Sequence, residues 1–478
     1  MDEIKHECGL FGVYGSLDAT EKVYQGLYSL QHRGEESAGI ASTDGSSIVW
    51  HKGMGLVGNV FKSRDLRRLR NSAAIGHVRY STIGRSEWQN AQPLVAEYSG
   101  GQVAVAHNGQ LVNTSLLRRD LERGGAVFQT QTTRHNHTPS DSEVILHLMA
   151  KPEYRENLSG LLRDLKGAFS LLILTPEEMI AARDPNGFRP LCIGKLKDGY
   201  AVASESCALD QIGAEYLREV SPGEIVYIGK NGLRSETFAP AKPSYCIFEL
   251  IYFSRPDSMI YGENVHLIRK RLGAKLAEEC PVEADMVIPV PEGGNSAAMG
   301  YSQASGIPLE RGFVRNHYIG RTFIQPDVEQ RQQKAEMKLN AISDVVTGKR
   351  VVVVDDSIVR GTTSKSRLGL LKRAGAKEIH VRISCPPHRY PCYYGIDFQI
   401  KEELIAAVRP LEEITEFLEV DSLGYLSIEG LLSCTSSPKD YCVACFAGKY
   451  PVQAEIVKKA REGAEEWEEK AGEHTIVV

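Results

Sequence analysis

The chain has 478 residues, a length that favours two or three domains. Hydrophobic residues make up 42% and charged residues 24%, which argues against a disordered, collagen-like or coiled-coil chain. Lysine plus arginine number 56 against 61 aspartates plus glutamates, and the net charge of -5 offers no footprint for nucleic acid or an anionic membrane. Without a cationic leader or a run of about 18 apolar residues, we expect a cytoplasmic protein.

The first half of the chain combines short strands with helices. Strands are predicted where apolar or β-branched runs lead into polar or glycine turns, at residues 73–76, 103–106, 171–174 and 200–203. Helices are predicted for the amphipathic stretches 22–31 and 142–149. This mixture indicates sheets covered by helices. The polar stretch 129–139, QTQTTRHNHTP, is interpreted as a surface loop because it lacks an acidic or cysteine partner for its two histidines.

A proline-containing segment separates this half from the next. Residues 238–244, FAPAKPS, are the best linker candidate, so we place one domain at 8–237 and a second at 238–478, with 1–7 as a leading segment. After the linker, helices and strands alternate, at 265–279, 286–289, 295–304, 351–354, 363–374 and 378–383. Such alternation predicts a parallel α/β domain. Residues 454–469 are charged and helical by composition.

The strongest motif is VVVVDDSIVRGTTS, residues 351–364. Four valines predict a strand that is buried on both faces. Asp355 and Asp356 follow at its carboxyl end, where they can bind sugar hydroxyls or Mg²⁺. The small, donor-rich turn that opens the next helix suits a phosphate. A plain helix cap and turn is the alternative. The phosphate site is favoured because two adjacent carboxylates repel each other unless a cation or hydroxyls compensate them.

This stretch resembles the phosphoribosyl pyrophosphate (PRPP) loop of type I phosphoribosyltransferases and, in its full form DDSIVRGTTS, the glutamine PRPP amidotransferase family. The resemblance extends to YFSRPDS (252–258), GRTFIQP (320–326), MKLN (337–340), YGID (394–397) and GKYP (448–451). It implies that Asp355 and Asp356 contact ribose hydroxyls and Mg²⁺. It also implies that the loop from Arg321 to Lys338 closes over pyrophosphate. The 5-phosphate would be held by Ser357, Arg360, Gly361, Thr362, Thr363 and Ser364.

Two positions depart from the family pattern. Gly293 stands where the family usually has a hydroxyl residue that is often a Mg²⁺ ligand, so contact there is possible only through backbone or water. Glu336 stands where a basic residue is common. These departures motivate an alternative function, a PRPP- or nucleotide-sensing regulator that has lost transfer activity. A glutamine amidotransferase with another acceptor is disfavoured, because the phosphate loop specifies a ribosyl donor.

Cys8 lies in the apolar stretch CGLFGVYG, where a buried small hydrophobe is the ordinary interpretation. If residues 1–7 were removed as a propeptide, however, Cys8 would become terminal. Its α-amino group, with a reference pKa of about 7.7 to 8.0, could then serve as the base for its own thiol. This is the logic of N-terminal nucleophile (Ntn) amidohydrolases.

The motifs that follow resemble the glutamine amidotransferase branch of that family. They occur in the family's order as QHRGEESAGI (31–40), GHVRYST (76–82), AHNGQLVN (106–113), SDSE (140–143) and DPNGFRPL (184–191). The resemblance implies that Cys8 attacks the glutamine amide, with Asn108 and Gly109 as the oxyanion hole. Arg79 would bind the substrate carboxylate and Asp141 its ammonium group. Taken alone, Arg79 and Asp141 could form an ordinary surface ion pair, and Asn108-Gly109 could be a hairpin turn. The joint occurrence of all the motifs favours a glutamine site.

The ten cysteines sort into three groups. Cys442 and Cys445 form CVAC, which by itself is compatible with a zinc hook, a redox pair or coincidence. The resemblance adds Cys246 and Cys392 as partners and implies a [4Fe-4S] cluster, with Zn²⁺ as the competing metal. Cys8 is the nucleophile candidate. The others are interpreted as structural, namely Cys192, Cys207, Cys280, Cys385 and Cys434.

Together these features predict an α+β Ntn hydrolase domain of αββα layers, followed by a type I phosphoribosyltransferase α/β domain. The predicted enzyme hydrolyses glutamine and transfers the ammonia to C1 of PRPP, with Mg²⁺ and the cluster as cofactors. The resemblance implies a homotetramer that purine nucleotides inhibit. No nucleic acid or membrane partner is expected.

Overall fold

The computed structural model describes residues 8–80, 88–98, 100–129, 140–155, 157–316 and 339–452. The chain divides into two compact units. Among the described residues, the N-terminal unit comprises 8–245 with 393–397 and 450–452, and the C-terminal unit comprises the rest of 246–449. The predicted linker, 238–244, is thus part of the N-terminal unit, which runs to Tyr245. The predicted helix at 454–469 and most of the polar loop 129–139 lie outside the described residues.

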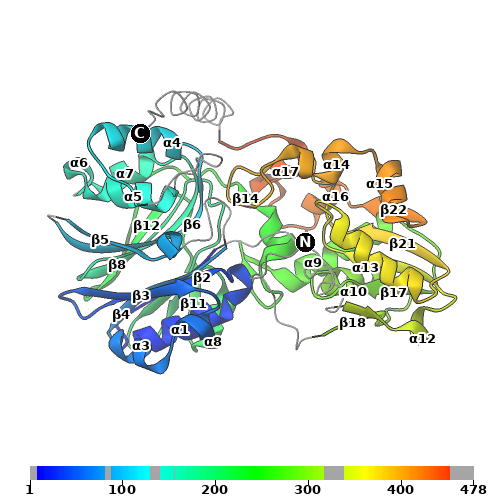
Figure 1. Cartoon of the computed structure of the whole chain (residues 1–478), viewed down its shortest axis with the longest axis horizontal. Helices are drawn as coiled ribbons and strands as arrows, with labels where there is room; N and C mark the ends of the chain where they lie inside the picture. The colour runs from blue at the N-terminus through cyan, green and yellow to red at the C-terminus, as the bar shows by residue number, and fades with distance from the viewer. Residues whose placement is uncertain are drawn as a thin grey trace, which may run out of the picture. The chain divides into compact units, whose positions relative to one another are not determined.

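Two antiparallel sheets form the N-terminal unit (Figure 1). The seven-stranded sheet has the order β11 (Glu215–Glu219), β9 (Cys192–Lys195), β10 (Tyr200–Ala203), β1 (Gly9–Tyr14), β4 (Ala73–Arg79), β2 (Ser37–Thr43), β3 (Ile48–Met54). The six-stranded sheet has the order β13 (Gly232–Thr237), β12 (Glu224–Gly229), β8 (Glu178–Arg183), β7 (Gly167–Leu174), β6 (Gly101–Leu111), β5 (Leu94–Tyr98).

Three buried clusters of apolar side chains separate four layers in this unit. Successive residues of a strand face opposite sides of the sheet, so Phe11 of β1 packs with Val23 and Leu27 of α1 (Ala19–Ser29). Leu10 instead joins Leu172 of β7 in the core between the two sheets. The third cluster joins the six-stranded sheet to α4 (Thr114–Arg123), α5 (Asp141–Ala150) and α7 (Leu158–Asp164). The expected αββα arrangement is confirmed.

The C-terminal unit contains a four-stranded parallel sheet with the order β17 (Met286–Pro289), β20 (Arg350–Asp355), β21 (Glu378–Ile383), β22 (Ser422–Tyr425). The valines of β20 are buried, as their unbroken apolar run predicts. The principal helices are α9 (Val265–Glu279), α10 (Asn295–Ser305), α13 (Thr362–Arg373) and α15 (Leu411–Leu418). Because β17 and β20 are parallel neighbours, the loops that follow them meet at one sheet edge.

The predicted strands and helices within the described residues are confirmed, with shifts of a few residues at their ends. The strand predicted at 103–106, for example, is the centre of the longer β6. Among the described residues we find no helix that is both long and apolar enough to span a membrane.

Candidate active sites

Cys8 immediately precedes β1 at the edge where β4 ends. Gly9 is paired with Val78, so the chain brings Cys8 beside Arg79, the last residue of β4. The Cys8 Sγ lies 3.7 Å from the backbone oxygen of Tyr80, and the side chain is partly buried. Arg79 is buried as well. The structure therefore places the predicted nucleophile and the predicted carboxylate-binding arginine at the same sheet end.

The six-stranded sheet contributes Asn108 and Gly109 at this end. His77, two residues before Arg79, forms a hydrogen bond through Nε2 to the backbone oxygen of His107 at 3.1 Å. Asn108 follows His107 in β6 and is only 2% exposed. Its amide nitrogen Nδ2 has no hydrogen-bond partner among the described residues. A buried, unused donor is rare in a folded protein, and an oxyanion would satisfy it.

Gly109 cannot be replaced without strain. Its φ of +139° is disfavoured for residues with a side chain, and a Cβ atom would lie 2.2 Å from the Ala168 oxygen. The neighbouring strand β7 thus approaches β6 closely here. This approach fixes the orientation of the Gly109 peptide, which is what a preorganised N–H donor requires.

Asp141 is the first residue of α5, where the helix dipole favours a carboxylate. Its oxygens accept hydrogen bonds from the backbone N–H groups of Leu111 (3.2 Å) and Ser142 (2.8 Å). The His107 Nδ1 lies 3.4 Å from an Asp141 carboxylate oxygen. Burial raises the pKa of Asp141, but attraction to His107 and these hydrogen bonds outweigh it and hold that pKa below its usual value. An ionised Asp141 suits the binding of an ammonium group.

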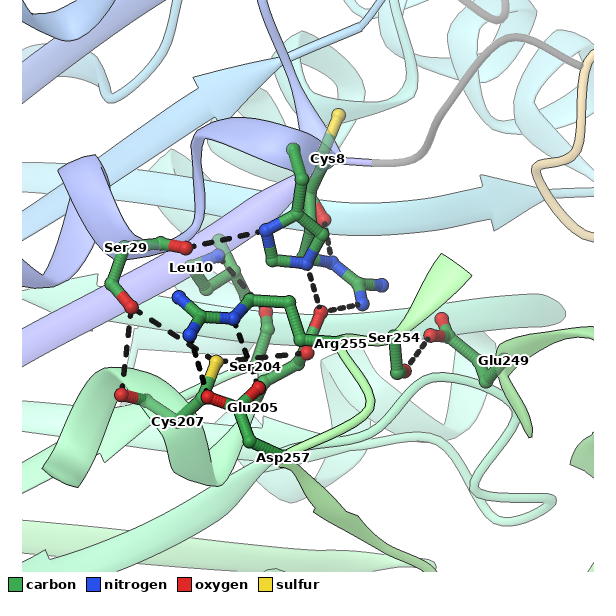
Figure 2. A network of polar contacts seen from close by, with 12 residues as sticks. Cys8, Leu10, Ser29, Ser204, Glu205, Cys207, Glu249, Ser254, Arg255 and Asp257 are labelled. Carbon is green, nitrogen blue, oxygen red and sulfur yellow. Dashed lines mark hydrogen bonds and ion pairs between the residues drawn. The ribbon is translucent and has the colours of Figure 1, made fainter. Parts of the chain in front are cut away.

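Sequence reasoning missed a buried ionic cluster that holds Cys8. Arg33 donates from Nε to the backbone oxygen of Cys8 at 3.0 Å and from Nη1 to Glu205 at 2.7 Å. His32 contacts the same Glu205 oxygen at 2.7 Å. Figure 2 shows Cys8 and Glu205 in this region. His32 and Arg33 lie within the QHRG motif, whose adjacent basic residues were a usable signal. Glu205, in a distant strand-to-helix turn, offered none.

In the C-terminal unit, the two acids follow β20 as predicted. Asp355 and Asp356 are nearly buried, and the Asp355 carboxylate accepts a hydrogen bond from the backbone N–H of Asp356 at 2.9 Å. Ser357 donates to Asp356 at 2.7 Å, and Arg367 of α13 lies 3.8 Å from Asp355. Burial, reinforced by the charge of Asp355, raises the pKa of Asp356 to about 7. Carboxylate oxygens are hard donors of the kind that Mg²⁺ prefers, so the pair fits that ion.

Gly293 lies directly against this pair. The loop after β17 is joined to β20 by the Val290 N–H, which donates to the Val354 oxygen at 2.9 Å. A Cβ atom on Gly293 would fall 1.7 Å from the Asp356 Oδ2. The Asp356 carboxylate thus occupies the space that a side chain at position 293 would need. Position 293 therefore supplies no side-chain ligand.

The predicted phosphate-binding turn opens α13. Gly361 precedes the helix with a φ of +85°, and Thr362, Thr363 and Ser364 form its first turn. Arg360 turns toward Glu403, to which its Nε donates at 2.9 Å and its Nη2 at shorter range. The structure thus places Arg360 in an ion pair. Arg321, Glu336 and Lys338 lie outside the described residues.

The four candidate cluster cysteines lie close enough to interact electrostatically. Burial raises the pKa of Cys445, and Cys442, Cys392 and Cys246 raise it further. None of the four is in a disulfide. Four thiols match the donor set of an iron-sulfur cluster or zinc. Within the described ranges, however, no three histidine, cysteine, aspartate or glutamate side chains are arranged to hold a metal ion.

Comparison with known families agrees with this division. Residues 77–211 match the glutamine amidotransferase domain family, and residues 262–394 match the phosphoribosyl transferase domain family. Fold and sites thus define a glutamine amidotransferase joined to a phosphoribosyltransferase.

Amidophosphoribosyltransferases from other organisms match almost the whole chain. The amidophosphoribosyltransferase of Bacillus subtilis is 49% identical and covers 94% of this chain and 95% of its own length. That of Methanocaldococcus jannaschii is 45% identical, covering 94% and 99%. A solved structure of the B. subtilis enzyme, complexed with ADP and GMP, superimposes with a TM-score of 0.86 at 49% identity, covering 93% of this chain and 98% of that one.

The chain therefore belongs to the amidophosphoribosyltransferases. It hydrolyses glutamine and transfers the ammonia to C1 of PRPP, which gives 5-phosphoribosylamine, glutamate and pyrophosphate in the first committed step of purine synthesis. The predicted function is thus confirmed, and the regulator without transfer activity is set aside.

Proposed function

We propose that Cys8, made terminal by removal of residues 1–7, is the nucleophile of the glutaminase half-reaction. Its thiol loses a proton to its own α-amine and attacks the side-chain carbonyl carbon of glutamine. The C–N bond then breaks, and the proton passes from the amine to the leaving ammonia. Water cleaves the resulting thioester to glutamate and restores the thiol.

One observation carries this proposal, the buried and unused Nδ2 donor of Asn108. Asn108 lies on β6, which the His77 hydrogen bond joins to β4, beside the end of β1 that Cys8 precedes. With the Gly109 N–H, it would stabilise the oxyanion that forms during attack. Arg79 would form two parallel hydrogen bonds to the substrate α-carboxylate, while the ionised Asp141 would receive the α-ammonium group.

For the second half-reaction, we propose that Asp355 and Asp356 bind the ribose hydroxyls of PRPP and Mg²⁺. When bound, Mg²⁺ would stabilise the negative charge of the pyrophosphate leaving group. Ser357 and the backbone N–H groups at the start of α13 would hold the 5-phosphate, because a helix N-terminus attracts anions. Arg360 would have to leave Glu403 to contribute. Arg321 and Lys338 remain candidates for the pyrophosphate.

The remaining assignments are proposals of the same kind. We propose that Cys246, Cys392, Cys442 and Cys445 hold a [4Fe-4S] cluster, supported by their shared electrostatic environment. Iron, sulfide and zinc analysis tests it, and zinc in place of iron would refute the cluster. The complex of the B. subtilis enzyme with ADP and GMP supports inhibition by purine nucleotides. We also propose a cytoplasmic homotetramer, which light scattering would test.

The decisive experiment for the glutaminase site is Cys8→Ala. We expect glutamine-dependent pyrophosphate release to fall about 10⁴-fold or more, as when a nucleophile is removed from other hydrolases. Ammonium-dependent release should persist because it bypasses glutamine. N-terminal sequencing of the active protein should begin at Cys8. Retained glutamine activity in the variant, or an intact Met1 on active enzyme, would overturn the proposal.

A further inference from the structure

A buried ionic cluster lies beneath Cys8 and has no part in the proposed chemistry. Glu205 is fully buried and Arg33 is 1% exposed, and the two side chains are paired at 2.7 Å. Both Arg33 Nη1 and His32 Nε2 contact the same carboxylate oxygen, Oε1. The second oxygen, Oε2, accepts a weak hydrogen bond from the Cys207 thiol at 3.7 Å. Figure 2 shows Glu205 at the centre of these contacts, with Cys8 above it.

A hydrogen bond from Arg33 connects the cluster to the nucleophile. The Nε of Arg33 donates to the backbone oxygen of Cys8 at 3.0 Å. Ser204, adjacent to Glu205, holds the chain two residues further on, since its Oγ accepts from the Leu10 N–H at 2.9 Å and its N–H donates to the Leu10 oxygen at 3.0 Å. The Ser204–Glu205 pair therefore fixes both ends of the tripeptide that begins at Cys8.

This support matters most once Cys8 is terminal. A terminal residue is joined to the fold by a single peptide bond, so tilting of that peptide plane would displace the amine and the thiol together from the substrate. A hydrogen bond to its carbonyl oxygen holds that plane, and with it the Cα atom that carries both groups. Near-attack geometry is sensitive, and a displacement of 1 Å can cost about 100-fold in rate. Arg33 is thus placed to fix the position of the Cys8 Cα atom, from which the amine and the thiol side chain extend.

Glu205 in turn fixes Arg33. A guanidinium and a carboxylate are both costly to bury, and an apolar pair of similar size often serves stability equally well. Burial raises the pKa of Glu205, yet His32 and Arg33 outweigh it and keep that pKa below its usual value, so the carboxylate stays charged. The His32 ring is itself held by a hydrogen bond between its Nδ1 and the backbone oxygen of Ser29, 3.2 Å away. The carboxylate therefore has one defined position.

We propose that Glu205 is a positioning residue for the Cys8 nucleophile. It acts through Arg33, and His32 holds the carboxylate in place. The proposal rests on the proposed role of Cys8. It assigns to Glu205 an effect on the rate of attack and not on glutamine binding, which Arg79 and Asp141 would provide.

The test is Glu205→Gln in the full-length enzyme. We expect the glutaminase kcat to fall about 10- to 100-fold while the KM for glutamine stays within about threefold, since misplacement of the nucleophile costs rate. Alkylation of Cys8 by a chloroketone analogue of glutamine should slow in parallel. Ammonium-dependent pyrophosphate release should be unchanged, which shows that the phosphoribosyltransferase unit is folded, while the retained KM for glutamine shows that the glutaminase unit is folded. Unchanged kcat and alkylation would overturn the proposal.

The matched control is Glu224→Gln, which removes a mostly buried carboxylate that pairs with Arg218 at 2.7 Å in the same unit. If both variants lose kcat equally, Glu205 has only a structural role and the proposal is wrong.

If Glu205→Gln does not fold, variants of His32 test the proposal instead, because the His32 side chain is more exposed. His32→Ala should lower kcat about 3- to 10-fold at constant KM, and His32→Gln, which keeps a donor, should restore most of it. Wild-type kcat in His32→Ala would then overturn the proposal. Glutamine activity retained in Cys8→Ala would instead refute the role of Cys8, whatever the Glu205 variant does.

Discussion

The two candidate sites are built in opposite ways. The acids and the phosphate turn of the C-terminal unit come from one continuous strand, turn and helix, residues 350–373. The glutamine site draws on β1, β4, β6 and α5, and buried hydrogen bonds and ion pairs hold those elements together. A contiguous site takes its geometry from local secondary structure. A dispersed site needs supporting residues behind the reacting groups, and its sensitivity to substitution should extend to them.

The largest effect that tests this contrast is expected from Asn108→Ala. Loss of one oxyanion donor typically costs about 10²- to 10³-fold in kcat. Glutamine-dependent turnover should fall by that amount, whereas ammonium-dependent turnover should not change. Asn113→Ala is the matched control, because Asn113 is also buried but its amide already donates to the Asp164 oxygen at 2.9 Å. An equal loss of kcat in both variants would refute the oxyanion role.

The contrast also explains what could be predicted from sequence. Asp355 and Asp356 were predictable because the strand, the acids and the turn adjoin in the chain. Arg79, Asn108 and Asp141 were predicted only through motifs that resemble a known family, and Cys8 through those motifs together with the chemistry of a terminal cysteine. Glu205 was not found, because its partner Arg33 lies 172 positions away and nothing local marks the pairing. The ion pair of Arg360 was missed for a similar reason, since Glu403 lies 43 positions beyond it.

The next effect probes the contiguous site at Gly293, a neighbour that is distant in the chain. Gly293→Ser places a Cβ atom where the Asp356 carboxylate now lies, so that carboxylate must move. Overpacking of this kind costs about 1 to 3 kcal/mol, and we expect the KM for PRPP to rise about tenfold. The glutaminase kcat serves as the internal reference. Gly369→Ala in α13, where a Cβ meets only the end of Arg373, should change neither value. A lower KM for PRPP in Gly293→Ser would show that the hydroxyl binds ligand and that Asp356 adapts.

A smaller effect compares how the two units respond to acid. Each contains a buried histidine whose pKa burial lowers to about 3, namely His77 and His388. Such a residue stays neutral in the folded protein while the unfolded chain takes up a proton below about pH 6.5. Stability is therefore unaffected above that pH and declines as the pH falls from about 6.5 toward 3. At pH 5 each histidine should cost about 2 kcal/mol.

His388→Phe tests the acid response of the C-terminal unit alone. Phenylalanine suits this position because His388 packs among Phe248, Phe398 and Phe446. Hydrogen exchange at pH 7 and pH 5 should show that the variant removes about 2 kcal/mol of the acid sensitivity at β20. Packing losses are the same at both pH values, so the difference isolates the proton. The acid sensitivity at β6, near His77, should be unchanged. If the variant reduced the acid sensitivity of hydrogen exchange equally at β20 and β6, the two units would not unfold separately.

The smallest expected effect concerns Arg360, a predicted member of the contiguous site that forms an ion pair with Glu403. Arg360 pairs with the partly exposed Glu403, and such pairs are worth about 0.2 to 1 kcal/mol. Glu403→Gln should free the guanidinium for phosphate and lower the KM for PRPP about 1.5- to 5-fold, while Arg360→Met should raise it. The ammonium-dependent reaction isolates both effects from the glutamine site. A raised KM in Glu403→Gln would instead show that the ion pair orders the turn, and Arg360 would then support the site without binding phosphate.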